Sequence, residues 1–201
     1  MIPCKERRGA QFAERTIMLN TFKTPRLHAV RMAECHETML AEIHADERVM
    51  ATNGGVRSAA ENRAYLERNI AHWDEHGFGV WVFLNAERDL VGRGGILRID
   101  ILDVCEVELN YSVAAEYWRQ GYATEMATDS LLLGFEHLPV TSIIAFTQVA
   151  NAGSRKVMEK VGMTYECDFT HYRLPHALYR IQKSEMSASP SAAEKVGVRP
   201  D

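Results

Sequence analysis

Long apolar runs are missing from this chain of 201 residues. No stretch approaches the roughly 20 apolar residues that a bilayer-spanning helix needs. The first residues, MIPCKERRGAQFAERTIM, are basic but lack the apolar centre of a secretory signal. We therefore expect a cytoplasmic protein that has no membrane partner.

An excess of positive charge is missing too. Lys and Arg number 23 against 27 Asp and Glu, which gives a formal net charge of -4. Proteins that bind nucleic acid or an anionic membrane surface generally carry a basic excess or patch. The composition favours a protein without a nucleic-acid partner.

Cysteine is scarce and scattered. The four cysteines stand at positions 4, 35, 105 and 167, and none forms a CxxC pair. This usage is typical of a reducing compartment, and we expect no disulfide framework.

The residues that are present indicate one soluble globular domain. Apolar residues make up 46% and charged residues 25%, which is ordinary for such a protein, and the length suits one domain with a sizeable core. From Ser184 onward the sequence is rich in Ser, Ala and Pro, which is typical of disorder. We expect a flexible leader at 1–23, a folded domain at 24–183 and a disordered tail at 184–201.

Hydrophobic periodicity and turn residues predict an alternation of strands and helices. Ser58 and Glu61 have the spacing of a capping box, and Gly77 is placed to end the helix that this box begins. The fold class is α+β or mixed α/β, with helices on both faces of one sheet. The predicted strands are 26–32, 78–84, 90–99, 104–113, 141–149, 163–169 and 177–182, the second to fourth forming an antiparallel meander, and the predicted helices are 33–44, 58–77, 122–137 and 151–162.

One loop, YWRQGYATE at Tyr117–Glu125, has the composition of an anion site. The start of a helix offers unpaired backbone N–H groups and a partial positive charge, and Gly121 allows a ligand to approach the backbone. Together with the charge of Arg119, these features suit a phosphate or pyrophosphate. The Walker and GxGxxG patterns are absent, and Gly92-Arg93-Gly94-Gly95 lies in a strand, where we expect a bulge or close packing.

The order of several segments resembles the GCN5-related N-acetyltransferases, most closely the branch that modifies ribosomal-protein N-termini. The resemblance covers nearly all of 24–183, and it implies a twisted, mostly antiparallel sheet with one splayed strand pair. Trp118 departs from the family's general Q/R-x-x-G-x-G/A loop but is usual in this branch. The similar segments are TPRL, HGFGVWVF, LVGRGGI, VELNYSV, YWRQGYATE and NAGSRKVMEKVGM.

The resemblance implies acetyl-CoA as co-substrate and no metal. Val113, at the end of its strand, would pair its backbone with the pantetheine arm, and Asn151 would contact a pantetheine amide. The pyrophosphate would bind the backbone amides of Arg119, Gln120, Gly121, Tyr122, Ala123 and Thr124.

Direct acetyl transfer to an amine needs a base, an oxyanion site and help for the leaving thiolate, and it needs no enzyme nucleophile. By resemblance the base is Glu108. Glu106 points to the same face of the strand and is the alternative base. A surface position for Glu108, without a catalytic role, is the competing interpretation.

The thiolate would be supported by Ser154 according to the resemblance, because the position that carries a tyrosine in many members is Met158 here. The competing interpretation makes Asn151 a helix cap and Ser154 a first-turn residue. The oxyanion would be held by a backbone N–H near Tyr111 or Ser112. His72 and His76 lie four apart on a helix, but a surface face is the favoured interpretation over a metal site.

Two function classes remain open from the sequence. The first is an N-acetyltransferase that acts on a protein N-terminus or a small-molecule amine, as a monomer or homodimer. The second is a module that binds acetyl-CoA without turnover, which Met158 and Asn110 keep open. A nucleotide hydrolase is disfavoured because the chain has no Walker lysine.

Overall fold

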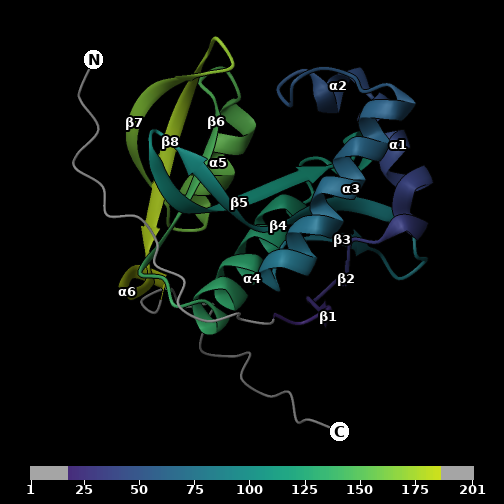
Figure 1. Ribbon diagram of the computed structural model, residues 1–201, viewed down its shortest axis with the longest axis horizontal. Helices are drawn as coiled ribbons and strands as arrows, with labels where there is room; N and C mark the ends of the chain where they lie inside the picture. Colours follow the sequence, from purple (N-terminus) through teal and green to yellow (C-terminus); the bar gives the residue numbers. More distant parts are fainter. Residues whose placement is uncertain (1–17, 187–201) are drawn as a thin grey trace, which may run out of the picture.

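The computed structural model describes residues 18–186, which form a single mixed sheet flanked by helices (Figure 1). Within these residues the strand order is β1-β2-β3-β4-β5-β6-β8-β7. The fold is therefore α+β, as predicted. The strands are β1 (Thr21–Lys23), β2 (His28–Arg31), β3 (Val80–Leu84), β4 (Leu90–Ile101), β5 (Val104–Val113), β6 (Ser142–Gln148), β7 (Thr164–His171) and β8 (Leu174–Gln182).

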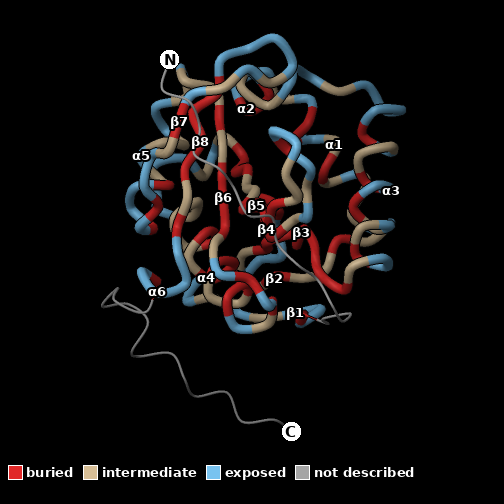
Figure 2. Tube along the Cα trace, turned by 60° about the vertical axis from the view of Figure 1, so that its left-hand side comes forward, coloured by how far each residue is buried: buried red, intermediate tan, exposed pale blue. Residues whose placement is uncertain are grey.

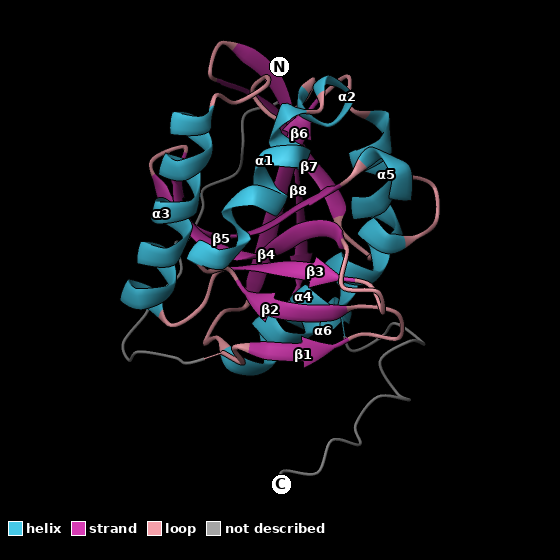
Figure 3. Cartoon of the chain, turned by 90° about the vertical axis from the view of Figure 1, so that its right-hand side faces the viewer, coloured by secondary structure: helices cyan, strands magenta, loops and turns pink. Residues whose placement is uncertain are grey.

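The helices lie on both faces of the sheet, which confirms that expectation. Figure 3 shows α1 and α3 in front of the strands and α4 behind them. The helices are α1 (Glu37–Ala45), α2 (Glu47–Met50), α3 (Ala59–His76), α4 (Tyr122–His137), α5 (Ala152–Lys160) and α6 (Lys183–Met186), with 3-10 turns at Glu34–His36 and Ala115–Tyr117.

The boundaries of α3 follow from its terminal residues. The Ser58 hydroxyl accepts the N–H of Glu61, and the Glu61 carboxylate accepts the N–H of Ser58, which completes the predicted capping box. Gly77 ends the helix with φ 76°, a left-handed conformation that glycine adopts without strain. The capping residues Ser58 and Gly77 therefore predicted both ends of this helix correctly.

The sheet is divided between β5 and β6. Every other neighbouring pair is antiparallel, whereas β5 and β6 run parallel and pair only at Glu108 and Ile144. Figure 1 shows β6, β7 and β8 turning steeply away from β4 and β5. This divergence is the predicted splayed pair, and it leaves the backbone of β5 beyond Glu108 without a strand neighbour on that side.

Buried side chains concentrate along the central strands, the red segments of Figure 2. Trp73 and Trp81 are 1% and 0% exposed and meet edge to face with ring centroids 5.3 Å apart. They are packing aromatics, as expected. A Cβ on Gly92 would lie 2.4 Å from the Ser112 carbonyl oxygen, which confirms close packing as the role of this glycine.

Several boundaries differ from the sequence-based expectation. Met18 is buried and β1 pairs with β2, so residues 18–23 belong to the fold and not to a leader. Helix α6 extends three residues into the expected tail, and α2 was not predicted. The rest of the expected leader and tail lies outside the described residues.

Two of the cysteines, Cys35 and Cys105, are free thiols. Cys167 is disulfide-bonded, which the scattered spacing did not predict.

Candidate active site

The start of α4 presents a row of backbone N–H groups without protein partners. Gly121, the N-cap, has φ 85°, and Arg119 has φ 61°, an uncommon value for a residue with a side chain. Among the described residues, no N–H from Arg119 to Thr124 donates to a protein acceptor, and the first bonded N–H is that of Glu125. All six loop residues predicted from the sequence therefore lie together in an arrangement that suits an anion.

Arg26, in the segment before β2, holds this loop in place, a role that the sequence analysis missed. Its guanidinium donates to the Gln120 carbonyl oxygen at 2.9 Å and pairs with the Glu125 carboxylate at 2.6 Å. It also lies 4.0 Å from the centre of the Tyr122 ring. The TPRL segment thereby connects the edge of the sheet to the first turn of α4.

The end of β5 offers backbone groups to the gap in the sheet. The Ala114 N–H bonds the Val91 carbonyl, and Gly92 pairs with Val113. Because partners alternate along an antiparallel ladder, the N–H groups of Tyr111 and Val113 point away from β4 and toward the gap. The Val113 carbonyl already accepts the Trp118 indole N–H at 2.8 Å. Of the two oxyanion candidates, the ladder favours Tyr111, because the N–H of Ser112 points toward β4.

Glu108 is a buried carboxyl, 6% exposed, at the point where β5 and β6 part. Burial raises the pKa of Glu108 to about 7, against the lowering effects of a hydrogen bond from Asn110 and of the nearby Arg93 charge. The Asn110 amide N–H lies 3.4 Å from Glu108 Oε1. A carboxyl with this pKa can accept a proton near neutral pH, and the surface interpretation of Glu108 is wrong.

Glu106, the alternative base, is engaged elsewhere. Its two carboxylate oxygens accept N–H groups of Arg180 at 2.7 and 3.2 Å, and the same arginine pairs with Glu166 at 2.7 Å. Glu106 is 2% exposed. Both oxygens of Glu106 are thus occupied by Arg180, so the geometry favours Glu108 as the base.

Ser154 and Asn151 lie at the start of α5, on the far side of the gap. The Asn151 side chain accepts the Ser154 N–H at 3.0 Å, which confirms its capping role, and donates to the Thr52 hydroxyl at 2.9 Å. The Tyr111 hydroxyl meets the Ser154 hydroxyl at 2.9 Å, and burial raises the pKa of Tyr111 to about 12. Tyr111 is thus a second hydroxyl beside Ser154, which the sequence analysis did not single out, while Met158 is buried in the core.

The two histidines on α3 are structural. His72 Nδ1 lies 2.8 Å from the Phe78 carbonyl oxygen, and His72 Nε2 accepts the Arg98 N–H at 3.0 Å. His76 meets His72 edge to face, with ring centroids 4.5 Å apart. Within residues 18–186, no group of three or more potential metal ligands comes together. In the same part of the chain no helix is long and apolar enough to cross a membrane.

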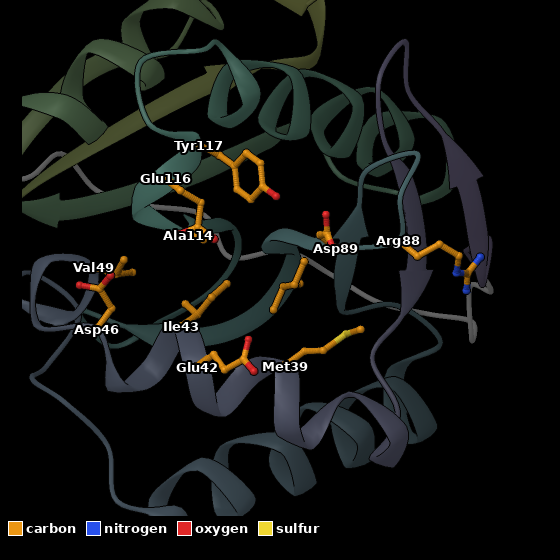
Figure 4. Close-up of a pocket in the computed structure, with 11 residues that line it drawn as sticks. Met39, Glu42, Ile43, Asp46, Val49, Arg88, Asp89, Ala114, Glu116 and Tyr117 are labelled. Atoms are coloured by element: carbon orange, nitrogen blue, oxygen red, sulfur yellow. The ribbon is translucent and has the colours of Figure 1, made fainter.

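A cavity of about 490 Å³ lies beside the loop rather than at Glu108. Figure 4 shows it between α1 on one side and residues 114–117 on the other. None of the predicted site residues lines it, although Ala114 directly follows Val113 at the end of β5. Its lining consists of Met39, Glu42, Ile43, Asp46, Val49, Arg88, Asp89, Leu90, Ala114, Glu116 and Tyr117.

A comparison with known families agrees with this fold, in which a splayed strand pair lies beside the start of α4. Residues 26–164 match the family described as acetyltransferase (GNAT) domain. The chain belongs to this family. It is therefore an acetyl-CoA-dependent acyltransferase by its family.

Three proteins illustrate what this chain is similar to. The FsC-acetyl coenzyme A-N(2)-transacetylase of Aspergillus fumigatus is 28% identical over 168 residues, which cover 77% of this chain and 70% of the relative. A GNAT-family acetyltransferase structure from Bacillus anthracis is 25% identical with a TM-score of 0.69, covering 82% of this chain and 99% of that one. The ribosomal-protein-S5-alanine acetyltransferase of Vibrio fischeri is 17% identical with a TM-score of 0.68, over 83% and 98%, and this likeness shows the fold alone.

Proposed function

We propose that this enzyme moves the acetyl group of acetyl-CoA directly to a primary amine, with Glu108 as the base. The observation that carries the proposal is the buried Glu108 carboxyl, with its pKa of about 7, at the point where β5 and β6 part. A base with this pKa balances availability and strength near neutral pH. Acetyl-CoA supplies the activated acetyl thioester.

Among the described residues the N–H groups at 119–124 have no protein acceptor, which supports binding of the pyrophosphate there. The free N–H of Val113 is placed for an amide of the pantetheine arm, while the Val113 carbonyl is held by Trp118. One N–H of the Asn151 side chain donates to Thr52, so a contact to pantetheine would use its second N–H or the free lone pair of its oxygen.

The proton balance can be followed through the residues of this chain. Glu108 takes one proton from the ammonium form of the acceptor, directly or through a water molecule, and the neutral amine then attacks the acetyl carbon. As the C–N bond forms and the C–S bond breaks, the second proton on the nitrogen passes to the departing CoA thiolate. The Tyr111 N–H, which faces the gap, stabilises negative charge on the acetyl oxygen. Ser154, backed by the Tyr111 hydroxyl, donates a hydrogen bond to the departing sulfur. No residue of the protein becomes acetylated.

The chemical class of the acceptor amine is part of the proposal. The relatives' names refer to an S5 alanine in one case and to FsC in another. The sequence resemblance to the ribosomal-protein branch favours an N-terminal amine, and small-molecule amines are the alternative. A module that binds acetyl-CoA without turnover is disfavoured by the buried, poised Glu108.

The test is thiol release from acetyl-CoA with a panel of amines, which includes peptides with Ser, Ala or Met at the N-terminus, polyamines and amino acids. We expect Glu108→Gln to lower kcat about 10²- to 10⁴-fold at pH 7.5, because the amide cannot accept a proton. Calorimetry should show unchanged affinity for acetyl-CoA. Glu106→Gln is the matched control, and its kcat should stay within a few-fold of wild type.

Unchanged kcat in Glu108→Gln would remove Glu108 from the proposal. Tight binding of acetyl-CoA without turnover of any amine would favour the binding module.

A further inference from the structure

Two arginines converge on one imidazole nitrogen on the α1 side of the sheet. Arg57 Nη1 lies 2.7 Å and Arg93 Nε 3.2 Å from His44 Nε2. Both guanidinium carbons also lie over the Tyr65 ring, at 4.4 and 4.7 Å from its centre. We call His44, Arg57, Tyr65 and Arg93 the arginine cluster.

The imidazole of this cluster is neutral. His44 Nδ1 lies 2.7 Å from the Asn62 side-chain oxygen, so Nδ1 carries the proton and Nε2 accepts from the arginines. Burial, followed by the two neighbouring guanidinium charges, lowers the pKa of His44 to about 3. The histidine therefore contributes no charge, and it offers one lone pair to two cations.

The cluster carries two positive charges without an ion-paired carboxylate. Burial and the Arg93 charge lower the pKa of Arg57 to about 10, which still leaves it charged at neutral pH. Among the described residues, neither Arg57 nor Arg93 forms a salt bridge, although Arg93 is only 3% exposed. Buried charges are normally paired, and an unpaired one is costly unless a ligand supplies the counter-charge.

The donors of the cluster are mostly unused. A guanidinium has five N–H donors. Within residues 18–186, Arg57 uses one of its nitrogens, toward His44, and Arg93 uses two, toward His44 and the Asn110 oxygen. Arg57 and Tyr65 are partly exposed, so the cluster is accessible from one side.

The cluster is connected to the base and to the far side of the gap. Arg93 Nη1 donates to Asn110 at 2.8 Å, and the Asn110 amide N–H lies 3.4 Å from Glu108. The segment that carries Arg57 also carries Thr52, which bonds Asn151 at the start of α5. An amine placed at Glu108 would thus be separated from Arg93 by one hydrogen-bonded side chain, that of Asn110.

From this arrangement we infer that the acceptor amine carries a carboxylate, which binds Arg57 and Arg93. The substrate class is then an amino acid, or a peptide with an acidic group close to its amino terminus. The inference rests on the proposed acetyl transfer, and it adds the charge that the acceptor must have beyond its amine. Glu61 and Glu108 act on Arg57 and Arg93 without forming an ion pair with them, so the substrate carboxylate would supply a counter-charge in direct contact and receive charge-assisted hydrogen bonds.

The experiment compares matched acceptors that differ in one charge. Thiol release from acetyl-CoA is measured with α-, β- and γ-amino acids and with dipeptides that begin with Asp or Glu, each beside its carboxamide counterpart. We expect at least one acid to react with a kcat/KM about tenfold to a hundredfold above that of its amide, the range of a charge-assisted hydrogen bond. Free amino acids and dipeptides form separate arms, which distinguish the two sources of the carboxylate.

Arg57→Gln should abolish this preference. It should lower kcat/KM for the acid tenfold or more, mainly through KM, and leave the amide within about twofold. Arg57→Lys, which keeps the charge, should restore part of the preference. Arg63→Gln is the control, because Arg63 is an exposed arginine on α3 that pairs with Glu37 at the surface, and it should change neither acceptor.

Equal or better reaction of the amides, or a preference for polyamines, overturns the inference while leaving acetyl transfer intact. If no amine reacts, calorimetry measures the binding of N-acetylated amino acids and of their amides to the CoA-loaded protein. Tighter binding of the acids supports the carboxylate inference, and equal or absent binding overturns it. Loss of acetyl-CoA binding itself would instead overturn the proposed function.

Discussion

Glu106 and Glu108 stand two residues apart on the same face of β5, and their surroundings are opposite. Glu106 faces Arg180, a cation that also binds Glu166 and the Ser142 hydroxyl. Among residues 18–186, Glu108 has one hydrogen-bond partner, the Asn110 amide at 3.4 Å, while Arg93, whose charge acts on Glu108, bonds His44 and Asn110. Near Glu106, two carboxylates contact one cation, Arg180. In the arginine cluster beyond Glu108, two cations contact one neutral imidazole, that of His44.

The comparison shows that burial alone does not make a catalytic carboxyl. The two glutamates are 2% and 6% exposed. Glu106 has a direct ion pair with Arg180, while desolvation is the largest influence on Glu108 and raises its pKa to about 7. Arg180 links β5, β6, β7 and β8 through its bonds to Glu106, Ser142 and Glu166. Glu108 is instead a buried carboxyl without an ion pair at the point where β5 and β6 part.

The largest effect should come from removing the cation of the stable pair. Arg180→Met leaves Glu106 buried without its partner, and we expect a loss of about 3–5 kcal/mol in the free energy of unfolding. Chemical denaturation at pH 7 measures it. Arg63→Met, which breaks a surface ion pair, should cost no more than about 1 kcal/mol. Similar losses in both variants would contradict the assignment of Arg180 as a buried structural cation.

Replacing each glutamate by glutamine should change the free energy of unfolding in opposite directions. A carboxyl whose pKa is raised in the folded state favours folding when protonated, and it loses that advantage as pH rises from the unfolded value through about 7. At pH 8 the ionised Glu108 therefore destabilises the protein, and Glu108→Gln should raise the free energy of unfolding by about 2–3 kcal/mol. Glu106→Gln should lower it by about 1.5–3 kcal/mol, because it weakens the bonds to Arg180.

Thermal unfolding at pH 8 and at pH 4.5 measures this difference. The gain in Glu108→Gln should disappear at pH 4.5, where the wild-type carboxyl is protonated in the folded state. A loss of stability in both variants at pH 8 would show that Glu108 is held by a partner like that of Glu106.

Local features of the chain were predictable at the level of single residues. The capping box at Ser58, the left-handed Gly77 and the bounds of β5 and α4 agree with the sequence analysis. The reason is that caps, turns and strand alternation depend on residues within one turn or one strand pair. The loop at Arg119–Thr124 was found for the same reason, because its signal lies in neighbouring residues.

Long-range partners were not predictable from the same signals. The pairing of Glu106 with Arg180 spans 74 positions, and that of Arg93 with His44 spans 49. Period-two alternation placed both glutamates on one face, but only the folded register decides which one meets an arginine. The TPRL segment was predicted to open a strand, but it lies between β1 and β2. Its role in holding the start of α4 through Arg26 depends on residues 94 to 99 positions away.

The smallest expected effect concerns the groups that moderate Glu108. The Asn110 hydrogen bond and the Arg93 charge both lower the pKa of Glu108, and the Asn110 contribution is the larger. Asn110→Ala and Arg93→Gln should therefore each move the acidic limb of the kcat/KM profile to higher pH, by less than about one pH unit, or about 1.4 kcal/mol. The shift should be greater for Asn110→Ala, and Arg63→Gln should leave the limb in place. A limb that stays at the wild-type pH in both variants would mean that the titration belongs to the acceptor amine and not to Glu108.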